Sequence, residues 1–129
     1  MQAIVNAALS QTAGRFLISG CGATAFHYLI MLTLIDRGWP AGAATAVGAG
    51  AGAVANYLAQ RQFTFRSQSS HVSAGPRYAA SVGACWLLNS LFFWVLHSGL
   101  SIDVYVSQVL ATLLLAGCNY WVLKRYVFL

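Results

Sequence analysis

The chain has 129 residues, of which 59% are hydrophobic and 7% charged, and a formal net charge of +5. An average soluble domain carries roughly a quarter charged residues, so these few charges cannot coat a soluble domain of this size. The composition excludes an ordinary soluble protein and predicts an all-α polytopic membrane protein. The cations lie between apolar runs rather than along one solvated face, which argues against nucleic acid as a partner.

The first segment, residues 1–14, is mixed in composition. Ile4, Val5, Ala8 and Leu9 can form one weakly apolar face of a helix there, and we expect this helix to lie on the membrane surface. A cleaved signal peptide is not expected, because no Lys or Arg precedes the first apolar stretch, which is short and interrupted.

Four apolar stretches follow, the first starting after Arg15. Each has the length, about 20 residues, that about 30 Å of hydrocarbon requires of a helix. None has a Lys, Arg, Asp or Glu in its central part. We therefore expect four transmembrane helices, at about residues 16–35, 40–60, 78–97 and 102–123.

Short turns join these stretches in pairs. Residues 36–40 contain a glycine and a proline, which stop helices, and residues 97–101 contain a glycine. Each pair of stretches is therefore expected to form a tight helical hairpin. Residues 66–76 are serine-rich and polar and end at Pro76, which predicts a solvated connector between the hairpins.

The hairpins are related by an internal repeat. At an offset of 63 residues Asn56 falls on Asn119, and the basic and aromatic positions that follow also match. At an offset of 62 residues Arg15 falls on Arg77. Both hairpins enter and leave the membrane on the same sides, so they are expected to be parallel repeats. The prediction is a single membrane domain, 1–129, made of repeat 1 (about 15–65), the connector (66–76) and repeat 2 (about 77–128).

The positions of the cations predict the orientation. Positive residues near the ends of spans are retained in the cytoplasm. Six of the seven Lys and Arg residues fall on the face shared by both termini and the connector, and only Arg37 lies opposite. Both termini are therefore expected in the cytoplasm.

No catalytic or metal-binding pattern is evident. Cys21, Cys85 and Cys118 lie inside apolar runs without metal-ligand spacing, as apolar filler does. The sequence has no phosphate-binding glycine loop followed by lysine, so no enzymatic activity, cofactor or metal is expected. The two acids, Asp36 and Asp103, lie in or beside the outer turns; they are candidates for an outer gate, with solvated turn residues as the alternative.

Four polar side chains lie inside the predicted spans. Asn56 and Asn119 lie five residues, roughly 7.5 Å, inside the basic positions, where an amide facing lipid is costly. They are candidates for contact with sugar or phosphate, or for a hydrogen bond between helices that locks the two repeats together. His27 and Asn89 lie deeper, near mid-membrane, and are candidates for contact with a passing polar headgroup or for a structural role.

The second span is made of small residues. Residues 41–55 are almost entirely Gly and Ala, with Gly48 and Gly52 four residues apart. Helices in lipid associate through close backbone contact at small residues, so this helix should pack against another, either within the chain or in a homo-oligomer. Four short helices give little room to shield a headgroup, which favours a homo-oligomer.

Motifs at the ends of the hairpins carry a family resemblance. They are Arg15-Phe16 with Gly20 and Thr24, Asn56-Tyr57 with Arg61, Phe63, Thr64 and Phe65, and an Asn-Tyr-basic-aromatic ending at 119–128. Over about residues 15–128 the chain resembles the GtrA-like family, although Ser19 departs from the valine expected before Gly20. The resemblance implies a small four-span protein of bacterial cell-surface polysaccharide synthesis. It further implies a flippase that moves a polyprenyl-phosphate-linked monosaccharide, such as undecaprenyl-phosphate glucose, across the cytoplasmic membrane.

The implied substrate has an apolar tail, an anionic phosphate and a polar sugar. Phosphate requires cations at the interface, and Arg can make two aligned hydrogen bonds to its oxygens. The phosphate-binding candidates are Arg61, Lys124, Arg15, Arg77 and Arg125. For each, the alternative role is topology signalling and contact with membrane lipids.

Two other functions remain open. One is a membrane anchor that recruits or positions a glycosyltransferase partner without moving lipid. The other is a small exporter resembling the small multidrug resistance family, which relies on an acidic residue within a span, and no such residue occurs here. Transport measured in reconstituted vesicles separates the flippase from the anchor.

Overall fold

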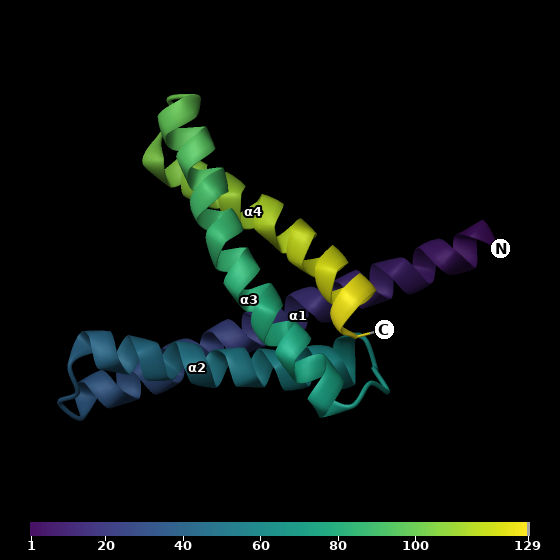
Figure 1. The fold of residues 1–129 in the computed structure, drawn as a ribbon, viewed down its shortest axis with the longest axis horizontal. Helices are drawn as coiled ribbons and strands as arrows, with labels where there is room; N and C mark the ends of the chain where they lie inside the picture. The colour runs from purple at the N-terminus through teal and green to yellow at the C-terminus, as the bar shows by residue number, and fades with distance from the viewer. Residues whose placement is uncertain (129) are drawn as a thin grey trace. The chain divides into compact units, whose positions relative to one another are not determined.

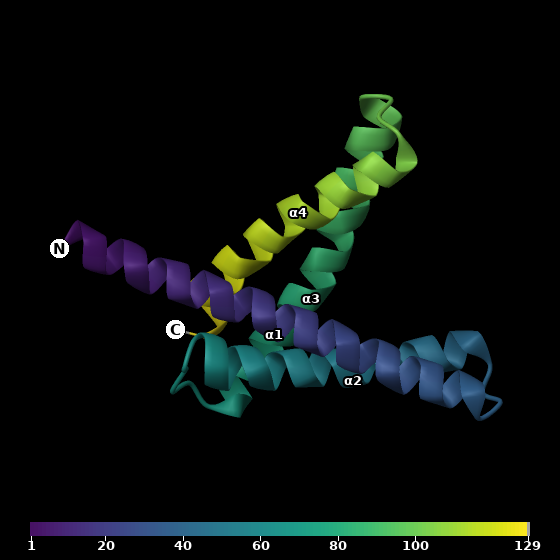
Figure 2. The ribbon, with the colours of Figure 1, turned by 180° about the vertical axis from the view of Figure 1, so that it is seen from behind.

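The computed structural model describes residues 1–128, and every regular element in that range is helical. The chain divides into two compact units, Met1–Ser67 and Gln68–Leu129, called here the first and second unit. Each unit contains two long α-helices, and a short turn joins them; the chain path can be followed in Figures 1 and 2. The predicted all-α class is confirmed.

Three helical segments in the described part of the chain are long and apolar enough to cross a membrane: Gln2–Asp36, His71–Gly99 and Val104–Val127. At most 17% of the residues in the apolar part of each are buried inside the protein. The apolar side chains that remain exposed cannot face water, so lipid must cover them. The chain is therefore embedded in a membrane and crosses it more than once.

The first unit begins with α1 (Gln2–Asp36), a continuous helix of 35 residues. The helix expected in residues 1–14 and the span expected from about residue 16 form one continuous helix, because helix-forming Ala, Leu and Gln extend it back to Gln2. Thr12, Thr24 and Thr33 donate their hydroxyls to carbonyl oxygens one turn earlier, at 3.0, 2.9 and 2.7 Å. These hydroxyls are satisfied within the helix and need no partner in lipid.

A tight turn follows α1, as the sequence predicts. Gly38 has a φ of +87°, which glycine adopts without strain, and its N–H donates to the Ile35 carbonyl at 2.9 Å. Trp39 N donates to the Leu34 carbonyl at 3.0 Å, which closes the helix end. Pro40 then caps α2 (Ala41–Ala59), and its carbonyl accepts from Ala44 N at 2.9 Å.

The helix α2 packs closely on α1 through its glycines. A Cβ added at Gly48 would lie 2.8 Å from both Cδ2 and the backbone oxygen of His27, and one added at Gly52 would lie 2.8 Å from His27 Cβ. Only hydrogen fits at either position. Of the two alternatives for these glycines, packing within the chain is the one that the structure shows.

The second unit consists of α3 (His71–Trp94), a π-helical turn η2 (Val95–Gly99), α4 (Val104–Val122) and a π-helical turn η3 (Leu123–Val127). The helix α3 begins earlier than the sequence suggests, because Ser70 caps it by accepting a hydrogen bond from Ser73 N at 3.3 Å. Pro76 lies inside this helix, so much of the predicted connector is helical. Ser107 and Ala111 of α4 are fully buried.

The second helix of each unit ends in a π-helical turn, η1 (Gln60–Thr64) after α2 and η3 after α4. In η1 Phe65 N donates to the Gln60 carbonyl at 2.9 Å, and in η3 Phe128 N donates to the Leu123 carbonyl at 2.9 Å. These turns occupy the duplicated basic and aromatic segments. π-helical turns are rare in proteins as a whole, but they occur frequently at functional sites. The η1 and η3 turns are therefore both candidates for function.

Asp103 caps α4, and its removal has a predictable cost. Its Oδ2 accepts from Tyr105 N at 2.9 Å and from Val106 N at 3.3 Å. We expect Asp103→Ala to lower the free energy of unfolding by about 1 kcal/mol, whereas Asp103→Ser should keep most of it. Thermal unfolding in detergent micelles measures both, and equal losses in the two variants would contradict a capping role.

Candidate functional site

The predicted cations gather at one end of each unit, where the second helix finishes in its π turn. The end with Arg15 and Arg61 is called the first basic end. The end with Arg77, Lys124 and Arg125 is called the second basic end. The two ends are built differently.

Buried polar side chains hold the first basic end together. Ser19 Oγ and Thr64 Oγ1 share a hydrogen bond of 2.9 Å between α1 and η1. Gln60, which is 1% exposed, donates its Nε2 to the Phe16 carbonyl at 3.4 Å and to Asn56 Oδ1 at 3.1 Å. We call Ser19, Thr64, Gln60 and the Phe16 carbonyl the polar clamp, since these contacts join η1 to α1.

The cations of the first basic end lie beside this clamp. The Arg15 guanidinium lies over the ring of Phe63, with its central carbon 5.7 Å from the ring centre. That distance permits a cation–π attraction between α1 and η1. Arg15 and Arg61 are both half-buried.

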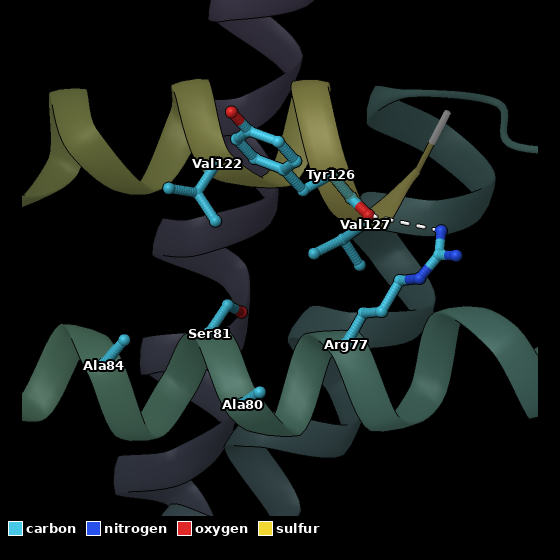
Figure 3. A pocket seen from close by; sticks show the side chains of 7 residues that line it. All are labelled: Arg77, Ala80, Ser81, Ala84, Val122, Tyr126 and Val127. Atoms are coloured by element: carbon cyan, nitrogen blue, oxygen red, sulfur yellow. Dashed lines mark hydrogen bonds between the residues drawn. The ribbon is translucent and has the colours of Figure 1, made fainter.

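The second basic end contains a groove of about 560 Å³ between α3 and the end of α4. Figure 3 shows side chains from both sides of this space. The residues that line it are Arg77, Ala80, Ser81, Ala84, Val122, Tyr126 and Val127. Ser81 and Val127 are buried, whereas Arg77, Ala80, Ala84 and Tyr126 are exposed, so the groove is open along one side.

Polar groups lie at the Arg77 end of the groove. Arg77 Nη1 donates to the Tyr126 carbonyl at 3.4 Å (Figure 3), and Ser81 Oγ donates to the Tyr78 carbonyl at 2.7 Å. The Tyr126 ring meets Trp121 edge to face, with centroids 5.3 Å apart. One open groove thus combines a cation and hydroxyls with alanine and valine side chains.

The other cations of the second basic end lie outside the groove lining. Lys124 and Arg125 are exposed, and Lys124 Nζ lies 5.7 Å from the ring centre of Tyr120. Of the five cations predicted from the sequence to bind phosphate, Arg77 is the one that lines the groove.

The two predicted asparagines make contacts within their own units. Asn56 Oδ1 accepts from Gln60 and so supports the polar clamp. Asn119 Oδ1 accepts from Cys85 Sγ at 3.5 Å, which joins α4 to α3. This contact lies within the second unit and does not join the two repeats.

The candidates predicted near mid-membrane, His27 and Asn89, and those predicted at an outer gate, Asp36 and Asp103, also lie outside the groove lining. His27 faces the glycines of α2, and its ring stacks on Tyr28 with centroids 5.2 Å apart. Within the described residues, His27 Nε2 is buried without a hydrogen-bond partner. Asn89 is half-buried in α3, Asp36 is exposed at the end of α1, and Asp103 caps α4.

The chain matches a known protein family over a range that includes both basic ends. A family model described as GtrA/DPMS, transmembrane domain, matches residues 15–128. The chain belongs to this family. The GtrA/DPMS domain contains both basic ends, and it places the chain among membrane proteins of lipid-linked sugar and glycosylation processes. No curated protein matches the chain significantly.

Several residues of this GtrA/DPMS domain were not singled out as site candidates from the sequence. They are the clamp residues Gln60 and Thr64 and the groove residues Ala80, Ser81, Ala84, Val122, Tyr126 and Val127. The repeat held a usable signal, because Gln60 aligns with Leu123 and Thr64 with Val127. A polar residue in one repeat opposite an apolar residue in the other marks where the two ends differ.

Proposed function

We propose that this protein is a flippase for a polyprenyl-phosphate-linked monosaccharide in the cytoplasmic membrane of a bacterium. It performs no covalent chemistry: the lipid enters from the cytoplasmic leaflet and its headgroup crosses between helices. Movement is downhill and is drawn by consumption of the lipid-linked sugar outside the cell. Family membership supports the substrate class.

The groove of the second basic end is the observation that carries the proposal. A phosphosugar lipid needs a cation for its phosphate, hydrogen-bonding groups for its polar head and an apolar wall for its tail. Arg77, Ser81 and the Ala80–Ala84 wall supply these within one groove. The groove is open along one side, so a lipid can enter it sideways without leaving the bilayer.

The proposed topology has four spans with both termini in the cytoplasm. Apolarity alone does not identify α2 as one of these spans. However, α2 and η1 have 19 and 5 residues, which together extend roughly 36 Å along the helix axis. Their contacts with α1 at His27 and Ser19 support a crossing beside α1. The basic ends then both face the cytoplasm, as positive residues near spans do.

Transport by the purified protein tests the proposal. Vesicles containing the full chain and fluorescent undecaprenyl-phosphate glucose should show faster exchange of the lipid between leaflets than vesicles with heat-unfolded protein. The physical reason is that a charged, sugar-bearing head crosses hydrocarbon slowly without polar partners. Phosphatidylglycerol in the same vesicles should not be accelerated to the same extent.

Failure of this experiment has a definite meaning. If the folded protein does not accelerate the phosphosugar lipid above the unfolded control, the transport proposal is wrong. An anchor that positions a glycosyltransferase would then explain the family membership. A homo-oligomer is part of the proposal, and cross-linking in the same vesicles shows whether copies associate.

A further inference from the structure

We infer that the two basic ends have different tasks: the groove of the second unit binds the phosphate and first isoprene units of the lipid, while the polar clamp keeps the first unit closed. This assignment rests on the proposed function for the identity of the lipid. It makes the binding site asymmetric although the sequence repeats. Three independent differences between aligned residues carry it.

The first difference is the clamp itself. Gln60 and Thr64 bond to α1 in the first unit, but their aligned partners Leu123 and Val127 have no side-chain polar group. Ser81, which aligns with Ser19, therefore turns back to the Tyr78 carbonyl of its own helix. In the described part of the chain, these two positions supply no side-chain hydrogen bond from η3 to α3, and the bond that does join the two elements is the longer one from Arg77 Nη1 to the Tyr126 carbonyl, at 3.4 Å.

The second difference is the size of the side chain next to the aligned serines Ser19 and Ser81. Ala80 lines the groove in the second unit, whereas the aligned residue of the first unit is Ile18. Isoleucine has three more side-chain carbon atoms than alanine. The same substitution in the second unit would therefore narrow the groove at the turn next to Arg77.

The third difference is the engagement of the cation. Arg15 is paired with the ring of Phe63. In the second unit the aligned ring, Tyr126, lies edge to face against Trp121, and within residues 1–128 Arg77 is bonded to the Tyr126 carbonyl alone, at 3.4 Å. A guanidinium has five N–H donors, so this single long bond leaves Arg77 able to bind phosphate in the bidentate manner.

The occupant is an isoprenoid phosphodiester rather than a free phosphate ion. Arg77 is the one cation in the lining, and Ala80, Ala84, Val122 and Val127 make most of the rest of it. A small anion would leave that apolar surface uncovered, while an isoprenoid chain would cover it. The phosphate beside Arg77 supplies the matching charge.

Exchanging aligned residues between the units tests the assignment. The triple variant Ala80→Ile, Leu123→Gln, Val127→Thr installs the clamp and the larger side chain in the second unit. It should lower the transport rate per folded protein by at least about tenfold, as expected for loss of a contact worth 1.4 kcal/mol or more. The single exchange Ile18→Ala in the first unit, which leaves the polar clamp intact, should stay within about twofold of the parent rate. The opposite order would overturn the inference.

A binding measurement gives a readout that does not depend on transport. In full-length protein whose three cysteines are replaced by alanine, one new cysteine is placed by Ala84→Cys or, as the matched control at the aligned position, Gly22→Cys. Undecaprenyl-phosphate glucose in the vesicles should slow maleimide labelling at position 84 at least about fivefold and leave position 22 unchanged. Equal slowing at both positions, or at neither, would overturn the inference.

Two further arms identify the source of the phosphate and separate the two proposals. Phosphatidylglycerol or inorganic phosphate should not slow labelling at position 84; slowing as large as that by the polyprenyl lipid would overturn the assignment to an isoprenoid phosphodiester. If the parent protein does not transport but position 84 is selectively protected, the proposed function fails and the binding site stands. If the parent transports and position 84 is not protected, the site fails and the function stands.

Discussion

A Gly48→Ala variant is expected to lose about 1–3 kcal/mol of stability, and Gly48→Leu to lose more than about 4 kcal/mol, enough to separate α1 from α2. The new Cβ would lie 2.8 Å from the His27 backbone oxygen, and backbone cannot move aside as the end of a flexible side chain can. Thermal unfolding of the purified protein, followed by tryptophan fluorescence in detergent, measures the loss.

Gly50 provides the control for this prediction. It lies on the same helix, but a Cβ there would have no neighbouring atom within 4 Å. Gly50→Ala should therefore be neutral or stabilising by up to about 1 kcal/mol, through the better helix propensity of alanine. Equal destabilisation by Gly48→Ala and Gly50→Ala would show that contact with His27 is not what limits residue size in α2.

Gln60→Ala is expected to cost about 2 kcal/mol and Gln60→Leu less than about 1 kcal/mol. Gln60 is 1% exposed, so alanine leaves a cavity, whereas leucine fills most of it. A hydrogen bond between helices in a membrane is worth only about 1 kcal/mol on average, so the loss of volume should dominate. Unfolding measured by steric trapping in micelles gives both values on one scale.

The aligned position of the second unit serves as the comparison. Leu123 is fully buried there, so Leu123→Ala should cost about as much as Gln60→Ala. If Gln60→Leu proved as damaging as Gln60→Ala, the hydrogen bonds that Gln60 contributes to the polar clamp would be worth more than the average hydrogen bond between helices in a membrane.

Apolar stretches and turn residues predicted the all-helical class and the turn of the first unit. Gly38 and Pro40 mark the turn of the first unit, where a positive φ and a fixed φ are needed. The helix starts were harder to predict. Nothing in residues 2–14 stops a helix, so α1 begins well before Arg15, and the Ser70 cap starts α3 before Pro76.

The places of the cations in the helices could be predicted, whereas their binding roles stay predictions. Cations at one end of each hairpin follow from the duplicated motif, and the structure places them there. The bond between Ser19 and Thr64 joins residues 45 apart in sequence, and it depends on how α1 and α2 are aligned lengthwise. The aligned pairs Gln60–Leu123 and Thr64–Val127 indicate that the two ends differ, but the sequence alone does not show which of these side chains face the neighbouring helix.

The length of α1 has a consequence for how motion in this protein can be observed. Its 35 residues extend about 52 Å, while the hydrocarbon layer is about 30 Å thick. In the proposed topology Arg15 lies at the membrane surface, and the helical residues before it extend about 20 Å further along the helix axis. A spin label near Gln2 would therefore amplify any tilting of the first unit during a transport cycle into a displacement large enough for distance spectroscopy.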